Sequence, residues 1–231
     1  QEAHGAIWVY FAIDEDAEPP ELIFPEEFYT GEWSGFVDIR SFECNHGLIR
    51  DNQLDPIHGS FLHAGTHALS WGHTAGELGF ERTKLGFVVF RKYQQNVNLD
   101  RTEVFRYDGC GFWTVTDLQY QEHEGGGTVR LFRSPTPIDR ENTLVYNYRL
   151  QKRSGWERDL WRFLYKNRVA ERGAAVLEQD RVALTTIPAD AQQRETLLQL
   201  DVGVSHIRRM YRTEAERQFK KITGMISAAA E

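Results

Sequence analysis

The chain has 231 residues, of which 41% are hydrophobic, and its 27 basic and 34 acidic side chains give a formal net charge of −7. An acidic balance without a basic stripe argues against nucleic-acid binding, and no apolar run approaches the roughly 20 residues that span a bilayer. The length favours one domain over residues 1–231. The two cysteines are too few for a disulfide framework, so we expect a cytoplasmic protein.

The first third of the chain predicts strands that lead into a helical segment. Apolar residues predict strands over residues 6–13 and 35–44, and the acidic, proline-bearing stretch 14–25 between them predicts a loop. A helix is expected after residue 44. Residues 63–79, rich in Gly, Ser, Thr and His, then predict a mobile loop.

Five β-rich runs follow, separated by turn-like sequences, at residues 85–93, 96–107, 111–120, 128–135 and 142–150. Because short turns join strands that are neighbours in the sheet, we expect antiparallel pairing.

The late part of the chain predicts helices. Residues 156–184 have a helical apolar stripe, and Gly173 is a position where this helix is expected to bend or break. Strands with an inserted helix and a long late helix predict an α+β fold of the helix-grip type. In such a fold an antiparallel sheet curls around a long C-terminal helix and leaves a cavity for a ligand.

The segment DNQLDPIHGSFLH, residues 51–63, is the most informative part of the chain because it sets carboxylates and two imidazoles close together. His58 and His63 are five residues apart, so on a regular helix they would point roughly 140° away from each other. One of them is therefore expected at a helix end or distortion, with Gly59 as the place where the helix loosens. Asp55 would share a face with His58 and orient its imidazole or relay a proton or electron to it.

The pattern of Asn52, Asp55, His58 and His63 resembles the iron-binding motif of the Rieske non-haem iron oxygenases, the ring-hydroxylating oxygenase α subunits. In that family a third ligand, an aspartate, comes from a helix far downstream, and the similar context VLEQDRVAL nominates Asp180. The resemblance implies that two histidines and one carboxylate hold a mononuclear Fe(II). It also makes Asp55 the bridge toward the electron donor and Asn52 a polar group close to the iron.

The resemblance covers nearly the whole chain. Residues 4–16 are similar to the strand by which the Rieske domain hands over to the catalytic domain, residues 134–150 to the late catalytic strands, and residues 201–212 to the final helix. The fold that it implies is the helix-grip fold expected above. Since the chain begins with Gln, we interpret it as the C-terminal catalytic domain of a longer polypeptide without its N-terminal Rieske domain.

Two cysteines, Cys44 and Cys110, cannot supply the Cys-x-His and Cys-x-x-His pairs of a Rieske cluster. Cys44 and His46 imitate the first pair, but we interpret them as a strand end packed before a helix. The resemblance places the [2Fe-2S] cluster on the missing domain of a neighbouring subunit in a homotrimer. It also implies that electrons come from NAD(P)H through a reductase and often a ferredoxin.

The activity that the resemblance implies is oxygenation. Such an enzyme uses O2 to hydroxylate or oxidatively demethylate an aromatic or other apolar cyclic substrate, and we favour the monooxygenase and demethylase branch. Replacing Asp55 by Ala or Asn is expected to leave iron bound but to uncouple or abolish turnover. The residues expected from strand position to line the substrate cavity are Phe61, Leu62, Trp71, Val88, Phe90, Phe112 and Trp113.

Two other functions stay open. Helix-grip domains also serve as carriers of lipids or other apolar ligands, for which Asp55, His58 and His63 would not be needed. The same histidines can bind zinc for hydrolysis, although no suitably spaced Glu is available as a base. Asn52, like its neighbour Asp51, can instead be a helix-capping residue, and Asp180 can be an exposed helix carboxylate. The identity of the bound metal separates these readings.

Overall fold

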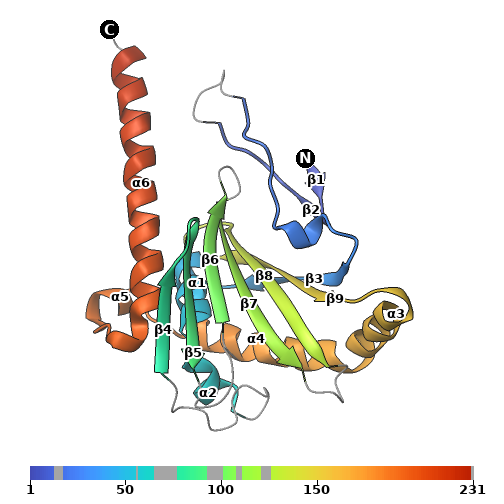
Figure 1. The fold of residues 1–231 in the computed structure, drawn as a ribbon. Coiled ribbons are helices and arrows are strands. Elements are labelled where there is room, and N and C mark those ends of the chain that lie inside the picture. Colours follow the sequence, from blue (N-terminus) through green and yellow to red (C-terminus); the bar gives the residue numbers. More distant parts are fainter. Residues whose placement is uncertain are drawn as a thin grey trace.

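The computed structural model describes residues 1–12, 18–55, 57–64, 77–92, 101–107, 111–120 and 126–229. Its main feature is a seven-stranded antiparallel sheet with strand order β3-β9-β8-β7-β6-β5-β4 (Figure 1). The strands are β3 (Trp33–Phe42), β4 (Glu77–Arg82), β5 (Gly86–Lys92), β6 (Arg101–Tyr107), β7 (Gly111–Tyr120), β8 (Gly127–Pro137) and β9 (Thr143–Lys152). Strands β4 to β9 pair in chain order, and β3 closes the far edge beside β9.

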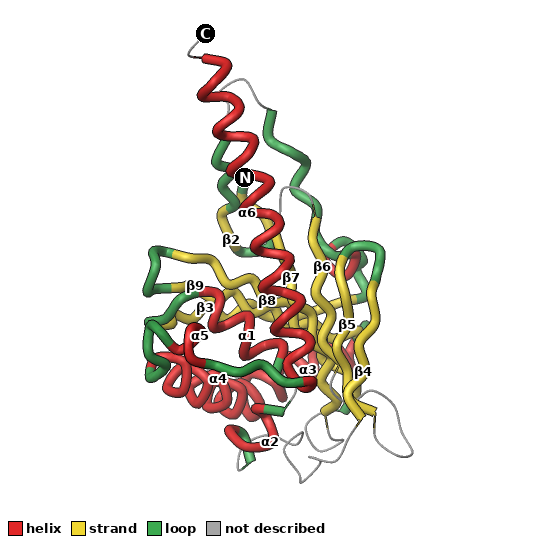
Figure 2. Tube along the Cα trace, turned by 90° about the vertical axis from the view of Figure 1, so that its left-hand side faces the viewer, coloured by secondary structure: helices red, strands yellow, loops and turns green. Residues whose placement is uncertain are grey.

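Six α-helices accompany the sheet among the described residues: α1 (His46–Leu54), α2 (His58–Leu62), α3 (Gly155–Leu164), α4 (Ala170–Thr185), α5 (Ala191–Arg194) and α6 (Val202–Ala229). A π-helical turn, Tyr165–Val169, joins α3 to α4. Helix α4 runs across the strands, and α6 extends well beyond the sheet (Figures 1 and 2). Within the described ranges, no helix is long and apolar enough to cross a membrane.

Both faces of the sheet are covered. Because cross-strand partners point to the same face, the paired residues Phe87 and Val104 share one face, whereas Trp113 points to the other. The first face packs against helices in a cluster of Leu54, Phe87, Val89, Val104, Val204 and Ile207. The second packs against the N-terminal segment in a cluster of Phe24, Trp113, Val115, Phe132, Tyr148 and Leu150. The helix-covered face is the one that positions the site described below.

The structure confirms the predicted α+β architecture, the strand before α1, the five later strands and the helical region that begins near residue 156. The predicted strand over residues 6–13 is wrong beyond Ile7, because Ala6–Ile7 (β2) pairs only with Glu2–Ala3 (β1). Strand β4 was not predicted, and its first three residues fall at the end of the predicted loop 63–79. Most of that loop, residues 65–76, lies outside the described residues.

No break falls at Gly173. It lies inside α4, and the irregular turn lies ahead of it at Tyr165–Val169. A Cβ atom at Gly173 would stand 2.1 Å from Nη1 of Arg149, a distance that real side chains do not tolerate. The glycine therefore allows the helix to approach a buried arginine of β9 closely.

Truncation of Ile207 in α6 tests whether this helix is part of the core. Ile207 is 0% exposed, so Ile207→Ala is expected to lower the free energy of unfolding by about 2–5 kcal/mol through lost burial and a residual cavity. The measurement is denaturant-induced unfolding. The control is Ile222→Ala on the same helix, at a position that is 37% exposed, where a change within about 0.5 kcal/mol is expected. Equal effects at both positions would contradict the packing of α6 against the sheet.

Candidate metal centre

The two histidines of the motif lie at opposite ends of a single short helix. His58 is the first residue of α2 and His63 directly follows its last residue, Leu62. The prediction that one histidine lies at a helix end is confirmed. The break between α1 and α2 falls after Leu54, however, and Gly59 is helical, so the predicted loosening at Gly59 is wrong.

Asp55 ends α1 and begins the connection to α2. Its Oδ1 accepts hydrogen bonds from the backbone N–H groups of Ile57, at 2.8 Å, and of His58, at 3.2 Å. Its backbone carbonyl oxygen contacts Nδ1 of the His58 ring. Asp55 thus holds the first turn of α2 through its carboxylate, and its backbone carbonyl, not its side chain, orients the His58 imidazole. The expected relay of a proton or electron by Asp55 stays a prediction.

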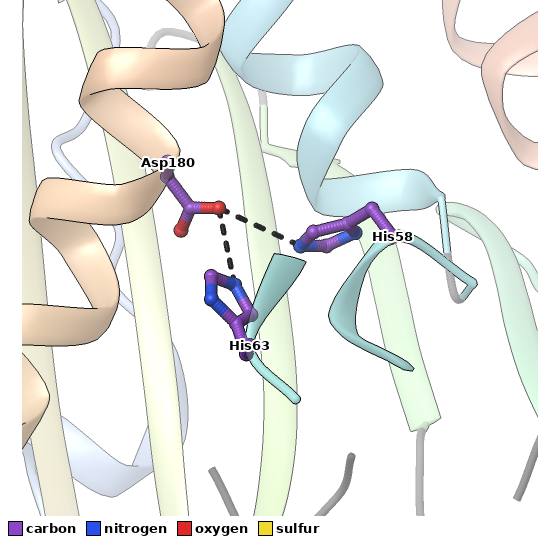
Figure 3. A group of neighbouring side chains, drawn as sticks. All are labelled: His58, His63 and Asp180. Carbon is purple, nitrogen blue, oxygen red and sulfur yellow. Dashed lines mark ion pairs between the residues drawn. The ribbon is translucent and has the colours of Figure 1, made fainter. Parts of the chain in front are cut away.

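Asp180 reaches the two histidines from α4 (Figure 3). Its Oδ1 lies 3.1 Å from Nε2 of His63 and 3.7 Å from Nε2 of His58. The potential ligand atoms of the three residues lie within 4.8 Å of one another. Asp180 and His63 are 8% and 6% exposed, so Asp180 is a buried carboxylate, and the alternative of an exposed helix carboxylate is wrong.

Both imidazoles are fixed through their Nδ1 atoms. Nδ1 of His63 lies 2.9 Å from the side-chain carbonyl oxygen of Gln179, and Nδ1 of His58 faces the Asp55 carbonyl oxygen. Because these partners are acceptors, each neutral ring carries its proton on Nδ1 and turns the lone pair of Nε2 toward Asp180. Three acceptor atoms therefore converge on one point, which is the arrangement that a cation requires.

The pKa of His63 reflects this convergence. Burial of the ring disfavours its charged form, but the hydrogen bond and charge of Asp180, together with Gln179, raise the pKa above its ordinary value, against the opposing charge of Arg133. A proton and a metal ion thus compete for the same place beside Asp180.

Asn52 is a direct neighbour of this group. Its Nδ2 donates a 3.2 Å hydrogen bond to Oδ1 of Asp180. Asn52 and Asp51 lie inside α1, whose N-cap is Asn45, so the helix-capping alternative is wrong for both. Asp51 instead pairs with Arg208 of α6 at 2.6 Å.

Cys44 lies away from this group. It is 6% exposed within an apolar cluster that includes Phe42, Ile49 and Leu184. Burial, with a smaller effect of Glu43, raises the pKa of its thiol to about 11, which disfavours the thiolate that a metal needs. This agrees with our interpretation of Cys44 and His46 as a strand end before a helix. Cys110 lies outside the described residues.

The predicted cavity lining is wrong for the strand residues Val88, Phe90 and Trp113, whose side chains do not lie on the helix-covered face. Trp113 is in the cluster on the opposite face of the sheet, and Val88 and Phe90 alternate with Phe87 and Val89 and so also point away from the helices. Phe61 is 72% exposed. Because both faces of the sheet are buried, apolar strand residues do not mark the face that holds the site. Trp71 and the side chain of Phe112 lie outside what the structure describes.

Comparison with known protein families assigns the chain to one of them. The sequence profile of the vanillate O-demethylase oxygenase C-terminal domain family matches residues 42–217, a range that contains His58, His63 and Asp180. The chain belongs to this family, a C-terminal domain family of Rieske-type non-haem iron oxygenases. No curated protein sequence matches the chain.

Solved structures share the fold at low sequence identity. The dicamba monooxygenase complex with dicamba has a TM-score of 0.61 and 12% identity over 92% of this chain and 65% of that chain. The NdmA QL mutant of Pseudomonas putida CBB5 with theobromine has a TM-score of 0.56 and 14% identity over 86% and 56% of the two chains. The terminal oxygenase of carbazole 1,9a-dioxygenase from Nocardioides aromaticivorans IC177 has a TM-score of 0.56 and 15% identity over 82% and 61%. The chain thus spans less than two thirds of each relative.

Two substitutions at Asp55 test how the His58 imidazole is positioned. Asp55→Ala removes the acceptor for the first N–H groups of α2. It is therefore expected to keep its iron at saturating Fe(II) but to bind it about 3- to 30-fold more weakly, in line with the cost of a lost helix cap. Asp55→Asn keeps an acceptor oxygen and is expected to bind Fe(II) nearly as tightly as the parent. The measurement is anaerobic competition against a chelating dye.

A matched control lies at the tight turn between β8 and β9. Asp139 accepts hydrogen bonds from the N–H groups of Glu141 and Asn142 in the same manner, far from the histidines in the sequence. Asp139→Ala is expected to leave Fe(II) affinity unchanged. Parental affinity in Asp55→Ala would show that its carboxylate does not position the centre.

Proposed function

We propose that the chain is the catalytic domain of a Rieske-type oxygenase in which His58, His63 and Asp180 hold one Fe(II). The observation that carries this proposal is the convergence of two Nε2 lone pairs and a buried carboxylate oxygen on one point. Two imidazoles and one carboxylate form the ligand set of non-haem iron oxygenases, which leaves positions open for oxygen and substrate.

The spacing of the ligand atoms fits a metal of this size. Ligand atoms about 2.1 Å from a metal and at right angles to each other are about 3 Å apart. The separation of His63 Nε2 from Asp180 Oδ1, 3.1 Å, agrees with this value. His58 Nε2, at 3.7 Å, needs only a small shift at the end of α2.

Each neighbouring side chain has a task in holding these ligands. Gln179 and the Asp55 carbonyl oxygen keep the protons on Nδ1, so both Nε2 atoms stay available. Asn52 donates to Asp180 and holds the carboxylate toward the histidines. The bound iron would supply the redox chemistry that activates molecular oxygen.

The electrons are proposed to come from outside this chain. In this proposal NAD(P)H reduces a reductase, in some systems a ferredoxin follows, and the [2Fe-2S] Rieske cluster of a neighbouring subunit in a homotrimer delivers electrons close to Asp55. The relatives' greater length supports a further domain, since the chain spans 65% of dicamba monooxygenase. A Rieske domain in the remaining length would supply the cluster.

The proposed reaction is hydroxylation or oxidative demethylation of an aromatic or other cyclic substrate with O2. The match to the vanillate O-demethylase oxygenase family favours demethylation. The family assignment also disfavours the alternative of an apolar-ligand carrier. A zinc hydrolase would use the same histidines, and the metal that binds decides between the two enzymes.

Removal of the Asp180 carboxylate tests the metal centre. After anaerobic reconstitution with Fe(II), about one iron per chain is expected in the parent. Asp180→Ala and the double variant His58→Ala/His63→Ala are expected to retain almost none, because each leaves too few ligands. The measurement is elemental analysis of the desalted protein.

Glu178→Ala is the matched control. Glu178 is a carboxylate two residues away on the same helix, 56% exposed and paired with Arg181, and its loss is expected to leave the iron content unchanged. Preferential retention of zinc would favour the hydrolase. Absence of any metal that depends on these three residues would reject the oxygenase and favour the carrier.

A further inference from the structure

A hollow of about 440 Å³ lies between α6 and the turn that joins β4 to β5. Hollows of this size hold small molecules in many proteins. The β4–β5 turn and helix α2, which carries His58, lie at opposite ends of these two strands (Figures 1 and 2). The hollow is therefore separate from the proposed iron site.

Part of the wall of this hollow is apolar. Arg82 and Phe87 are cross-strand partners, so both side chains lie on the helix-covered face, toward α6. Phe87 belongs to the apolar cluster beneath α6, and Met210 packs against that cluster. The ring of His206, one helical turn before Met210, lies 4.2 Å from the ring of Phe80 and holds α6 against β4. Phe87 and Met210 both line the hollow and can contact an apolar part of a ligand.

The rest of the wall is mainly basic. Arg82, Lys84 and Arg209 line the hollow, and all three are exposed. Within the part of the chain that the structure describes, none of their side chains forms a hydrogen bond or an ion pair. Glu214 also lines the hollow, but its carboxylate is held by Arg217 at 2.6 Å. The hollow thus gathers positive charge on a chain whose net charge is −7.

This unbalanced charge distinguishes the hollow from other basic positions of α6. Arg208, the residue before Arg209, pairs with Asp51 of α1 at 2.6 Å, so its charge is balanced within the chain. The three cations of the hollow instead repel one another. A bound anion would remove this repulsion, and the positive potential of the hollow would attract it.

We propose that this hollow binds a phosphate monoester with a short apolar group. The three terminal oxygens of a phosphate monoester match the three cations, and a guanidinium binds such oxygens through paired N–H groups. A carboxylate has two oxygens and a single charge, and so matches three cations less well. The apolar group lies against Phe87 and Met210. The site is distinct from the metal centre and does not depend on the proposed function.

The test is calorimetric titration of the full chain with hexyl phosphate, inorganic phosphate, hexanoate and 1-hexanol. A chelator is present, so no probe can bind to iron. Hexyl phosphate is expected to bind at least about tenfold more tightly than each of the others, because it alone combines the apolar group with the doubly charged head. Its affinity is also expected to fall as the salt concentration rises.

Three variants locate the binding. Arg209→Met and Lys84→Met each remove one exposed cation, and each is expected to weaken hexyl phosphate binding by about tenfold or more. Neither is expected to lower the unfolding midpoint without ligand, since repulsion among the cations is relieved. Arg212→Met is the matched control. Arg212 is another exposed arginine of α6 that does not line the hollow, and its loss is expected to change the affinity by less than about twofold.

Hexyl phosphate affinity that equals that of 1-hexanol, or that survives both Arg209→Met and Lys84→Met, would overturn the proposal. Tighter binding of hexanoate would overturn the choice of a phosphate, and equal binding of inorganic phosphate would overturn the apolar group. Binding of polyglutamate without binding of hexyl phosphate would replace the small ligand by an acidic segment of a partner protein. The proposed function is unaffected by each of these outcomes, because the titrations are made without iron.

Discussion

The convergence of three lone pairs on one buried point is the constraint on which the centre of this fold depends. Nε2 of His58, Nε2 of His63 and Oδ1 of Asp180 repel one another unless a proton or a metal ion lies between them. Helices α1, α2 and α4 must therefore keep these atoms together against their mutual repulsion. Two side chains help to hold them. Asn52 donates a hydrogen bond to Oδ1 of Asp180, and Gln179 accepts one from Nδ1 of His63, on the far side of the ring from Asp180.

The fold tolerates these buried polar groups because each face of the sheet has its own apolar core. The N-terminal segment covers one face with tightly packed aromatic rings, among them Phe24 and Trp113. Burial of such rings is the main favourable contribution to stability. The helix-covered face has one apolar cluster near α6, around Ile207, and another that joins α1 and α4, around Leu184. Between them the middle strands carry buried polar side chains such as Thr114 and Asn147.

The sequence predicts the positions of strands and helix ends well. It predicts less well which face of the sheet a strand side chain points to. Turn-like residues located the late strands, and the spacing of His58 and His63 predicted that a helix end lies between or beside them. Asp180 could be nominated only through resemblance, because nothing local distinguishes a buried helix carboxylate from an exposed one. The inner face of the strands was not identified because a strand buried on both faces lacks the alternation that marks its inner side.

The π-helical turn at Tyr165–Val169 keeps the same side of the helical region, from α3 to α4, facing the sheet. Side chains four apart on an α-helix drift sideways by about 40° at each repeat, because each residue advances by about 100°. A π turn takes more residues to complete and so corrects this drift. Trp161, Tyr165 and Val169 thus stay in one buried stripe, and the α-helix that follows delivers Asp180 to the same side. The number of residues in that turn therefore determines the direction in which the Asp180 side chain points. Deletion of one residue from the turn would rotate Asp180 away from the two histidines.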